Sequence, residues 1–385
     1  MPAARRPPPG PRRPPCSGAC GPRRRDADAM RVCFDARGLG GNLTGAGKAF
    51  VCLLRRLRED YPRHEYVLLA PRASGPWRLP RQLLWEQVEL PWRARRARAD
   101  VLHVTAGTSA PVVRCGPLVM TVHDLAPTRH PEFLPGARSR WYWGRFVPLT
   151  ARLADRVIVP SLATQRDLVE LAGVRAERIR VIPFAPPLDV AGPPAAGAVE
   201  RVRRAHGLPA RYVLYVGTID RRKDYGTLLE ALARLDPALH LVVAGTLIEG
   251  RTDFRARVAR LGLGGRVRTL GYVPDADLPA LYRGAAAFVY PSLYEGFGLP
   301  VLEAMACGTP VVSYNTTSLP EVAGSAAILL DPPVGAGALA DALTRAAGDA
   351  ATREALIARG LAQAGRFDWR RTAALTMEVY ESLGA

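Results

Sequence analysis

The chain contains two series of short apolar runs that alternate with helix-length segments, and this alternation restricts its fold more than any other feature. The runs predict strands at residues 31–34, 66–70, 101–104, 118–122 and 156–159, and then at 212–216, 241–244, 267–270, 286–290, 310–313 and 327–330. Continuous apolar strands separated by helices are typical of parallel sheets that are covered on both faces. We therefore expect an α/β chain with two Rossmann-like, doubly wound domains and a ligand cleft between them.

Proline and glycine mark the domain boundaries in this chain of 385 residues. Residues 185–205 open with a Pro- and Gly-rich stretch and predict a linker. This linker separates an N-terminal domain at 30–184 from a C-terminal domain at 206–366. The last segment, 367–385, is helical in pattern, and we expect it to pack back on the N-terminal domain.

Residues 1–29 consist mainly of Pro, Arg and Gly and predict a disordered tail, so Met30 is interpreted as the native start. Cys16 and Cys20 lie in this tail without further ligands nearby, which disfavours a metal clip. The six cysteines are spread over the chain and predict reduced thiols. The sequence has neither an apolar run of about 18 residues nor an apolar signal segment, so we expect a cytoplasmic protein.

The positive charge is concentrated in the first half of the chain. Lys and Arg exceed Asp and Glu by 12 in residues 30–184 (25 against 13), but by only 1 in residues 185–385 (21 against 20). A basic domain attracts anionic partners, such as nucleic acid or the inner face of a membrane, so peripheral membrane contact is one expectation. Because 51 of the 53 basic residues are Arg, a coding bias towards Arg is an equally good explanation.

The strongest local motif is Glu295-Gly-Phe-Gly-Leu-Pro-Val-Leu-Glu303, between two expected strands. Its glycines precede an expected helix, and Pro300 suits the first turn of that helix. Small residues before a helix N-terminus let a ligand reach unpaired amides, and the helix dipole favours an anion there. The motif therefore predicts a phosphate site, and Glu303 can accept hydrogen bonds from a ribose diol.

This motif resembles the paired-glutamate motif of glycosyltransferase family 4, whose members are retaining, nucleotide-sugar-dependent enzymes with the GT-B fold. The resemblance extends over nearly all of residues 30–385. It implies that Glu295 contacts the donor sugar and that Glu303 contacts the ribose hydroxyls. The same resemblance assigns the diphosphate to the segment formed by Gly296, Phe297, Gly298 and Leu299.

Two basic residues, Arg222 and Lys223, follow the first expected strand of the C-terminal domain. Two cations at a strand end can neutralise a leaving diphosphate, which gains charge as the glycosidic bond breaks. The family places a basic pair here. Many members have Arg directly after the glycine, where this chain has Thr218, so Arg222 takes the arginine role and Thr218 borders the donor. The alternative is an exposed run of charge.

His123 and a glycine-rich segment complete the expected site on the N-terminal domain. His123 ends the strand at 118–122, on the edge where open α/β sheets bind ligands. The family implies that this histidine approaches the donor sugar or the acceptor, although a lone histidine is more often structural. In the segment 38–48, Gly41 is expected to border the donor. Ala49 follows Lys48 where a P-loop needs Ser or Thr, which disfavours a P-loop ATPase.

The segment from Gly271 to Tyr282 resembles the base-binding loop of the family, so the backbones of Tyr272 and Val273 are expected to border the nucleobase. Asp275 and Asp277 are spaced like the metal-binding aspartates of the other glycosyltransferase architecture, but we interpret them as turn and helix-cap residues. Neither a metal nor a cofactor is expected, since cationic side chains and helix amides can stabilise the leaving group.

These features predict a retaining glycosyltransferase that uses His123, Arg222, Lys223 and Glu295 in catalysis. The donor is expected to be a nucleoside diphosphate sugar, with GDP-mannose as the first candidate, and the acceptor a glycan or a lipid-linked molecule. A nucleotide-sugar epimerase of GT-B architecture is one alternative. A nucleic-acid-binding protein is another, but the sequence shows no helix-turn-helix, RNP-type or zinc motif.

Overall fold

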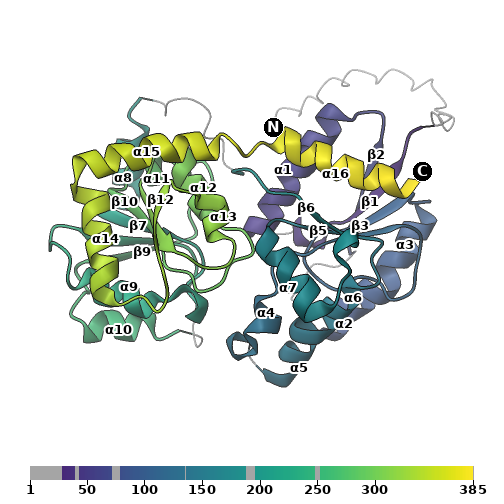
Figure 1. The fold of residues 1–385 in the computed structure, drawn as a ribbon, viewed down its shortest axis with the longest axis horizontal. Helices are drawn as coiled ribbons and strands as arrows, with labels where there is room; N and C mark the ends of the chain where they lie inside the picture. Colours follow the sequence, from purple (N-terminus) through teal and green to yellow (C-terminus); the bar gives the residue numbers. More distant parts are fainter. Residues whose placement is uncertain are drawn as a thin grey trace, which may run out of the picture.

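Two parallel six-stranded sheets form the framework of the molecule (Figure 1). The computed structural model describes residues 28–39, 43–71, 79–134, 136–187, 196–247 and 252–384. The N-terminal sheet has the order β2-β1-β3-β4-β5-β6, and the second sheet has the order β12-β11-β10-β7-β8-β9. The strand order reverses once in each sheet, at β1/β3 and at β7/β10, as in other doubly wound folds. The expected fold class is therefore confirmed.

The strands of the N-terminal sheet separate two layers of the core. They are β1 (Arg31–Asp35), β2 (Glu65–Leu69), β3 (Val101–Val104), β4 (Leu118–Thr121), β5 (Arg156–Val159) and β6 (Ile179–Val181). Alternate side chains point to opposite faces, so Val32 and Phe34 belong to one buried cluster and Cys33 to the other. Because both faces are buried, the strands read as continuous apolar runs, which is why the sequence could predict most of them.

Helices cover both faces of the N-terminal sheet. One face packs against α1 (Gly45–Asp60) and the C-terminal helix α16 (Trp369–Gly384). Other segments are α2 (Leu79–Leu84), η2 (Trp85–Glu89), α3 (Leu90–Arg96), α4 (Ala126–Arg129), α5 (Gly136–Trp141), η4 (Tyr142–Phe146), α6 (Val147–Ala151) and α7 (Leu162–Ala172). Both η2 and η4 are single π-helical turns, and each joins the α-helices before and after it. Short 3-10 turns lie at η1 (Arg37–Leu39), η3 (Pro131–Phe133) and η5 (Ala176–Arg178).

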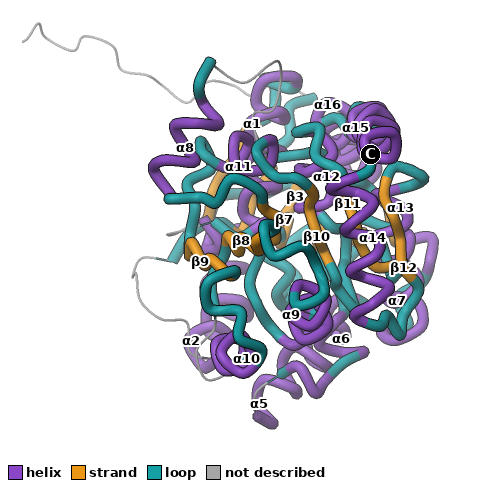
Figure 2. The backbone as a smooth tube through the Cα atoms, turned by 90° about the vertical axis from the view of Figure 1, so that its left-hand side faces the viewer, coloured by secondary structure: helices purple, strands orange, loops and turns teal. Residues whose placement is uncertain are grey.

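The second domain repeats the architecture (Figure 2). Its strands are β7 (Tyr212–Val216), β8 (His240–Ala244), β9 (Val267–Gly271), β10 (Ala287–Tyr290), β11 (Val311–Tyr314) and β12 (Ala327–Leu330). Its helices are α8 (Ala198–His206), η6 (Arg221–Lys223), α9 (Tyr225–Leu232), α10 (Phe254–Arg260), α11 (Leu278–Arg283), α12 (Leu299–Ala306), α13 (Leu319–Ala323), α14 (Ala336–Gly348) and α15 (Ala350–Ala364). Helices α9, α10 and α14 cover one face of this sheet, and α8, α11 and α12 lie on the other (Figures 1 and 2).

The last helix returns to the first domain. The chain leaves α15 in the second domain, and α16 lies along α1 beside the N-terminal sheet (Figure 1). Tyr380 on α16 is hydrogen bonded to Nδ1 of the buried His103 on β3 at 2.7 Å. At the start of α16, Trp369 donates to the Pro186 carbonyl at 3.0 Å, and Thr372 donates to the Pro183 carbonyl at 2.8 Å. The two segments that connect the domains are therefore hydrogen bonded to each other.

The structure differs from the sequence predictions in two local elements. Helix α8 occupies residues 198–206 and so takes up the last part of the expected linker 185–205, and β6 was not predicted. The expected tail 1–29 lies almost wholly outside the described residues, as do Cys16 and Cys20. Cys33, Cys52, Cys115 and Cys307 are free thiols. Within the described ranges, no helix combines the length and the apolar character that a membrane span requires.

Candidate active site

A cavity of about 490 Å³ lies between the two domains, at the carboxyl ends of their strands. Open α/β sheets bind ligands outside the carboxyl ends of their strands, in the crevice formed where the strand order reverses. The expected site residues that the structure describes all line this cavity: His123, Thr218, Arg222, Lys223, Tyr272, Val273, Glu295, Gly296, Phe297, Gly298, Leu299 and Glu303. Gly41 lies outside the described residues, whereas Gly45 and Lys48 from the same segment do line the cavity.

Lys223 and Glu295 form a buried ion pair at the centre of the cavity wall. Lys223 is 3% exposed, and its ammonium group donates to a Glu295 carboxylate oxygen and, at 2.7 Å, to the Tyr290 hydroxyl. Ser292 donates to the same Glu295 oxygen at 2.6 Å, and Thr317 accepts from the Glu295 amide at 2.9 Å. These contacts fix the direction of both charges before any ligand binds.

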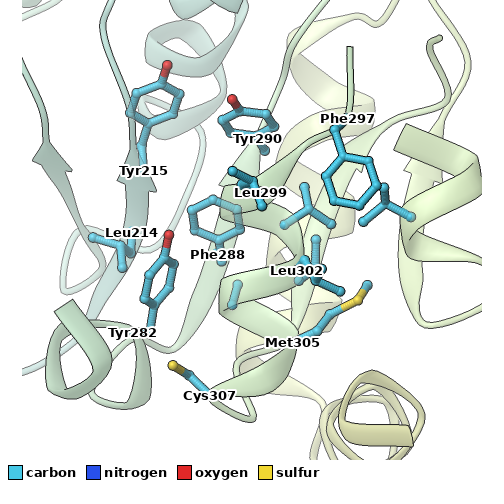
Figure 3. Packing of buried hydrophobic residues seen from close by; sticks show 14 of the residues in the cluster. Leu214, Tyr215, Tyr282, Phe288, Tyr290, Phe297, Leu299, Leu302, Met305 and Cys307 are labelled. Atoms are coloured by element: carbon cyan, nitrogen blue, oxygen red, sulfur yellow. The ribbon is translucent and has the colours of Figure 1, made fainter. Parts of the chain in front are cut away.

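The protonation states of this pair follow from burial and from the opposite charges. Burial alone would raise the pKa of Glu295, but the Lys223 and Arg222 charges outweigh burial and lower that pKa to about 2. Burial lowers the pKa of Lys223, an effect that the Glu295 charge opposes. The centroid of the Tyr290 ring lies 4.5 Å from Lys223 Nζ. This ring packs in turn against Phe288 and Tyr215, with ring centroids 5.8 and 6.0 Å apart (Figure 3).

Helix α12 begins at the cavity and carries Glu303 into it. Gly298 is the N-cap with φ 108°, a backbone conformation that favours glycine, and Pro300 stands in the first turn as expected. Glu303 is 5% exposed and accepts a hydrogen bond from the Tyr282 hydroxyl at 2.8 Å. Burial raises the pKa of Glu303 to about 7. The helix start therefore presents a site for an anion, and Glu303 presents a buried acceptor beside it.

Arg222 and His123 approach the same space from opposite domains. Arg222 Nη1 lies 3.5 Å from Oδ2 of Asp124, in an ion pair that spans the cleft. His123 Nε2 lies 2.9 Å from the Thr105 carbonyl oxygen, which can only accept, so this nitrogen carries the proton. Burial lowers the pKa of His123, which favours the neutral ring with Nδ1 as an acceptor. Nδ1 of His123 can therefore accept a hydrogen bond from a hydroxyl group.

The two domains are in direct contact at Gly296. Its carbonyl accepts hydrogen bonds from Ser161 Oγ at 2.7 Å and Thr164 Oγ1 at 3.2 Å, both in the N-terminal domain. A Cβ atom at Gly296 would lie 1.8 Å from the His123 carbonyl oxygen. Glu321 on α13 also accepts from the first two amides of α7, at 2.8 and 2.7 Å. The structure therefore represents a closed arrangement in which the loop after β10 touches the loop after β4.

The expected nucleobase end of the cavity lies near α1 and the loop after β9. Tyr272 and Val273 line this end, and Lys48 from α1 forms an ion pair with Asp275 across the domains. Asp277 occupies the N-cap position of α11 but makes no capping hydrogen bond. Its carboxylate instead accepts from Arg201 at 3.0 Å and lies 3.1 Å from His206 Nε2. The expected helix-cap role of Asp277 is thus replaced by a contact with α8.

Comparison with known proteins identifies the family. A family model described as "Glycosyltransferase Family 4" matches residues 39–185, and one described as "Glycosyl transferases group 1" matches residues 199–363. O-antigen chain mannosyltransferase B of Escherichia coli is 36% identical over 271 residues, which cover 69% of this chain and 70% of that protein. The chain belongs to glycosyltransferase family 4.

A second relative of this family 4 glycosyltransferase is much longer. Serotype-specific mannosyltransferase WbdA of Escherichia coli is 30% identical over 273 residues, which cover 69% of this chain but 33% of that protein. Among solved structures, Anabaena Alr3699/HepE in complex with UDP and glucose matches with a TM-score of 0.71 and 22% identity, over 92% of this chain and 100% of that one. This likeness, together with the two parallel six-stranded sheets, confirms the GT-B fold.

Several residues of this family 4 site had no motif that could reveal them. Tyr282 and Ser292 orient the two glutamates; both lie in or beside the expected binding segments, but no spacing marks a hydroxyl there as the partner of a carboxylate. Asp124, which pairs with Arg222, directly follows His123 in the sequence but belongs to no motif of its own. Lys48 did carry a signal, because it is one of only two lysines in the chain. Among the residues that the structure describes, no three His, Cys, Asp or Glu side chains are grouped so that they could hold a metal ion.

Proposed function

We propose that this glycosyltransferase transfers mannose from GDP-mannose to a glycan or lipid-linked acceptor with retention of configuration. The observation that carries the proposal is the joint placement of the Lys223–Glu295 pair, Arg222, the start of α12 and Glu303 in one interdomain cavity. This set offers cations and helix amides for two phosphates and a carboxylate for a ribose. His123 faces it from the other domain.

In the proposed complex, the diphosphate lies between the start of α12 and the basic pair. The amides around Gly298 and Leu299 bind its oxygens, and Arg222 and Lys223 stabilise the charge that develops as the bond to the sugar breaks. Both cations are held by carboxylates before the donor arrives, so little reorganisation is needed during the reaction. The ribose diol donates to Glu303, and the backbone at Tyr272 and Val273 borders the guanine.

We propose front-face attack as the route to retention. The bond from C1 to the donor phosphate oxygen breaks, and the acceptor oxygen forms its bond to C1 on the same face. The acceptor proton passes to the departing phosphate oxygen, which leaves as part of the nucleoside diphosphate. The geometry at Glu295 supports this route over a covalent intermediate, because its carboxylate is engaged by Lys223 and Ser292 and its low pKa makes it a weak nucleophile. Glu295 is instead placed to bind a sugar hydroxyl.

Mannose is supported by two relatives whose names describe mannosyltransferases. Uridine is the competing base, since the similar Anabaena structure contains UDP. We therefore propose a thermal-shift panel with GDP-mannose, GDP, UDP-glucose, UDP and ADP-glucose on the full chain. A shift that is largest for GDP-mannose is the expected result. A larger shift with a UDP-sugar would refute the donor assignment, and no shift with any nucleotide would refute the proposed function.

The stereochemical outcome needs a separate measurement. NMR of the product distinguishes retention from inversion through the one-bond C1–H1 coupling constant of the transferred mannose, because the H1–H2 coupling is small in both anomers of this sugar. An α-linked product from the α-linked donor is expected. A β-linked product would contradict front-face attack, while leaving the transferase assignment unaffected.

A further inference from the structure

A second cavity lies between the domains, on the side where the two connecting segments meet. Its volume is about 600 Å³. Small-molecule sites in proteins typically have volumes of about 300 to about 1,000 Å³. Pro183 and Thr372 both line this cavity; they belong to the two connecting segments, and Thr372 donates to the Pro183 carbonyl at 2.8 Å. We call this space the hinge cavity.

The walls of the hinge cavity come from both domains. Leu162 at the start of α7 and Val181 at the end of β6 belong to the first domain, and Val322 on α13 belongs to the second. In Figure 1, α7 and α13 lie on either side of the boundary between the domains. Glu321 on α13 accepts from the amides of Leu162 and Ala163 at 2.8 and 2.7 Å, which holds the two walls together. The cavity therefore has this shape only in the closed arrangement, because an opening motion would separate α7 from α13.

Phe297 stands between the hinge cavity and the donor cavity. Both Phe297 and Pro160 line the two cavities. The Phe297 ring packs against Phe184 and Phe367, with ring centroids 5.5 and 5.9 Å apart. Phe297 also directly follows Gly296, where the two domains touch. A ligand in the hinge cavity would therefore contact the donor-binding loop without entering the donor site.

The wall of the hinge cavity offers apolar side chains to a ligand. Leu162 is 54% exposed, although the helix that it begins is held against the second domain. Apolar side chains from both domains line the same space: Leu162, Val181, Phe297, Val322, Phe367 and Leu375. Covering such side chains with an apolar ligand removes their surface from water, which is favourable. The cavity is therefore suited to a ligand with an apolar part.

The charges available to a ligand in the hinge cavity are positive. Arg366 and Arg371 line the cavity and are exposed. Arg366 donates to the Gln363 side chain at 3.2 Å, and neither guanidinium group forms an ion pair with a carboxylate among the described residues. The two carboxylates on the wall are already engaged: Glu321 accepts from the α7 amides, and Asp368 accepts from an amide in the first turn of α16 at 3.0 Å. Guanidinium groups bind carboxylate and phosphate groups well.

We propose that the hinge cavity is an effector site for an amphipathic anion, which has an apolar chain and one carboxylate or phosphate group. In the proposed complex the chain lies against Leu162, Val322 and Phe297, and the anionic group lies between Arg366 and Arg371. An occupant that contacts both domains binds the closed arrangement better than an open one, and it therefore stabilises closure. Such coupling is reciprocal, so donor and anion should strengthen each other's binding by the same factor. Only this coupling rests on the proposed function; the site itself does not.

Isothermal titration calorimetry of the full chain, with each ligand below its micellar concentration, tests the site. The ligands are octanoate, decanoate, octyl phosphate and the uncharged octanol. We expect octanoate or octyl phosphate to bind with one molecule per chain and about tenfold or more tighter than octanol, because only the anions engage the arginines. The tighter of these two anions identifies the anionic group. Decanoate should bind about tenfold tighter than octanoate, because two further methylene groups are buried.

Two variants and one matched control locate the binding. Arg366→Gln with Arg371→Gln removes both charges, and Leu162→Trp fills the cavity; all three positions are exposed, so the melting temperature should be unchanged. We expect each variant to weaken anion binding about tenfold or more. Octanol binding should fall in Leu162→Trp but not in the arginine variant. The control, Arg359→Gln with Arg370→Gln, changes two exposed arginines of α15 and α16 that do not line the cavity, so its anion binding should equal that of wild type.

The coupling is measured by repeating the titration with the nucleotide that gives the largest thermal shift. Anion affinity should rise about fivefold or more in its presence, and nucleotide affinity should rise by the same factor when the anion is present. The site is refuted if neither anion binds, if octanol binds as tightly as the anions, or if the control loses binding as the arginine variant does. Equal anion affinity with and without nucleotide refutes the effector role. If no nucleotide binds, the proposed function fails, while the titration of the free protein still decides the site.

Discussion

The buried carboxyl group of Glu303 makes the stability of this protein depend on pH in a way that one substitution can isolate. Burial raises the pKa of Glu303 from its ordinary value of 4.5 to about 7 in the folded chain. Between these two values, the folded state keeps a proton that the unfolded state has lost. Stability from this group is therefore fully present below pH 4.5 and declines as pH rises towards 7, after which it stays constant.

The size of this effect follows from the two pKa values. Linkage predicts that Glu303 contributes about 2.5 kcal/mol less to the free energy of unfolding at pH 8 than at pH 5. Glu303→Gln keeps the shape and the contact with Tyr282 but cannot ionise. The free energy of unfolding of the variant minus that of wild type should therefore be about 2.5 kcal/mol higher at pH 8 than at pH 5, as measured by urea unfolding. Glu354→Gln, a change at an exposed position on α15, serves as the control.

Donor binding should depend on the same proton. A ribose diol donates two hydrogen bonds, so it binds the ionised carboxylate, and donor affinity should fall about tenfold from pH 8 to pH 6 in wild type. In Glu303→Gln, affinity is expected to be lower throughout and independent of pH. Calorimetry with the sugar nucleotide at both pH values measures this. A stability difference between variant and wild type that is the same at pH 5 and pH 8 would refute the reasoning.

Two further predictions concern the buried pair and the domain contact. Lys223→Met should leave Glu295 as an unpaired buried charge, lowering the free energy of unfolding by about 3 kcal/mol and turnover by about 100-fold or more. Adding Glu295→Gln should restore stability but not turnover, and wild-type stability in the single variant would contradict the ion-pair assignment. Gly296→Ala places a Cβ atom 1.8 Å from the His123 carbonyl in the closed arrangement, so turnover should fall about 100-fold while the melting temperature is unchanged. Turnover at the wild-type level would show that closure at this point is not required.

The sequence could predict the sheets because their inner strands are buried on both faces, whereas the edge strands β2, β6, β9 and β12 are partly exposed. Runs such as those of β4 and β11 are fully buried and consist mainly of apolar residues, which makes them visible without an alignment. Strand β6 escaped prediction because it has three residues and Arg180 stands in its centre. Helix α8 was hidden by the Pro- and Gly-rich residues before it and by its polar composition, with Val202 as its one buried residue.

The sequence predicted the site residues that belong to a motif, but it did not predict the residues that hold those motif side chains in place. Glu295 and Glu303 lie in a segment whose glycines and proline identify it. Their supporting hydroxyl groups, Tyr282 and Ser292, become visible only when the chain is folded, because a hydroxyl beside a carboxylate leaves no characteristic spacing. The two π-helical turns, η2 and η4, also have no sequence signature.

The two hydrogen-bonded segments that connect the domains determine how the protein would respond to proteolytic cleavage between the domains. Trp369 and Thr372 donate hydrogen bonds to the carbonyls of Pro186 and Pro183, so the two connections lie together on one side of the molecule. A hinge motion that opens the cleft would therefore pivot on this side. A protease that cleaved only the first connection would not release two separate halves. The fragment containing the second sheet would still hold the other fragment through α16, so the nicked protein should elute from a gel-filtration column at the position of the intact chain.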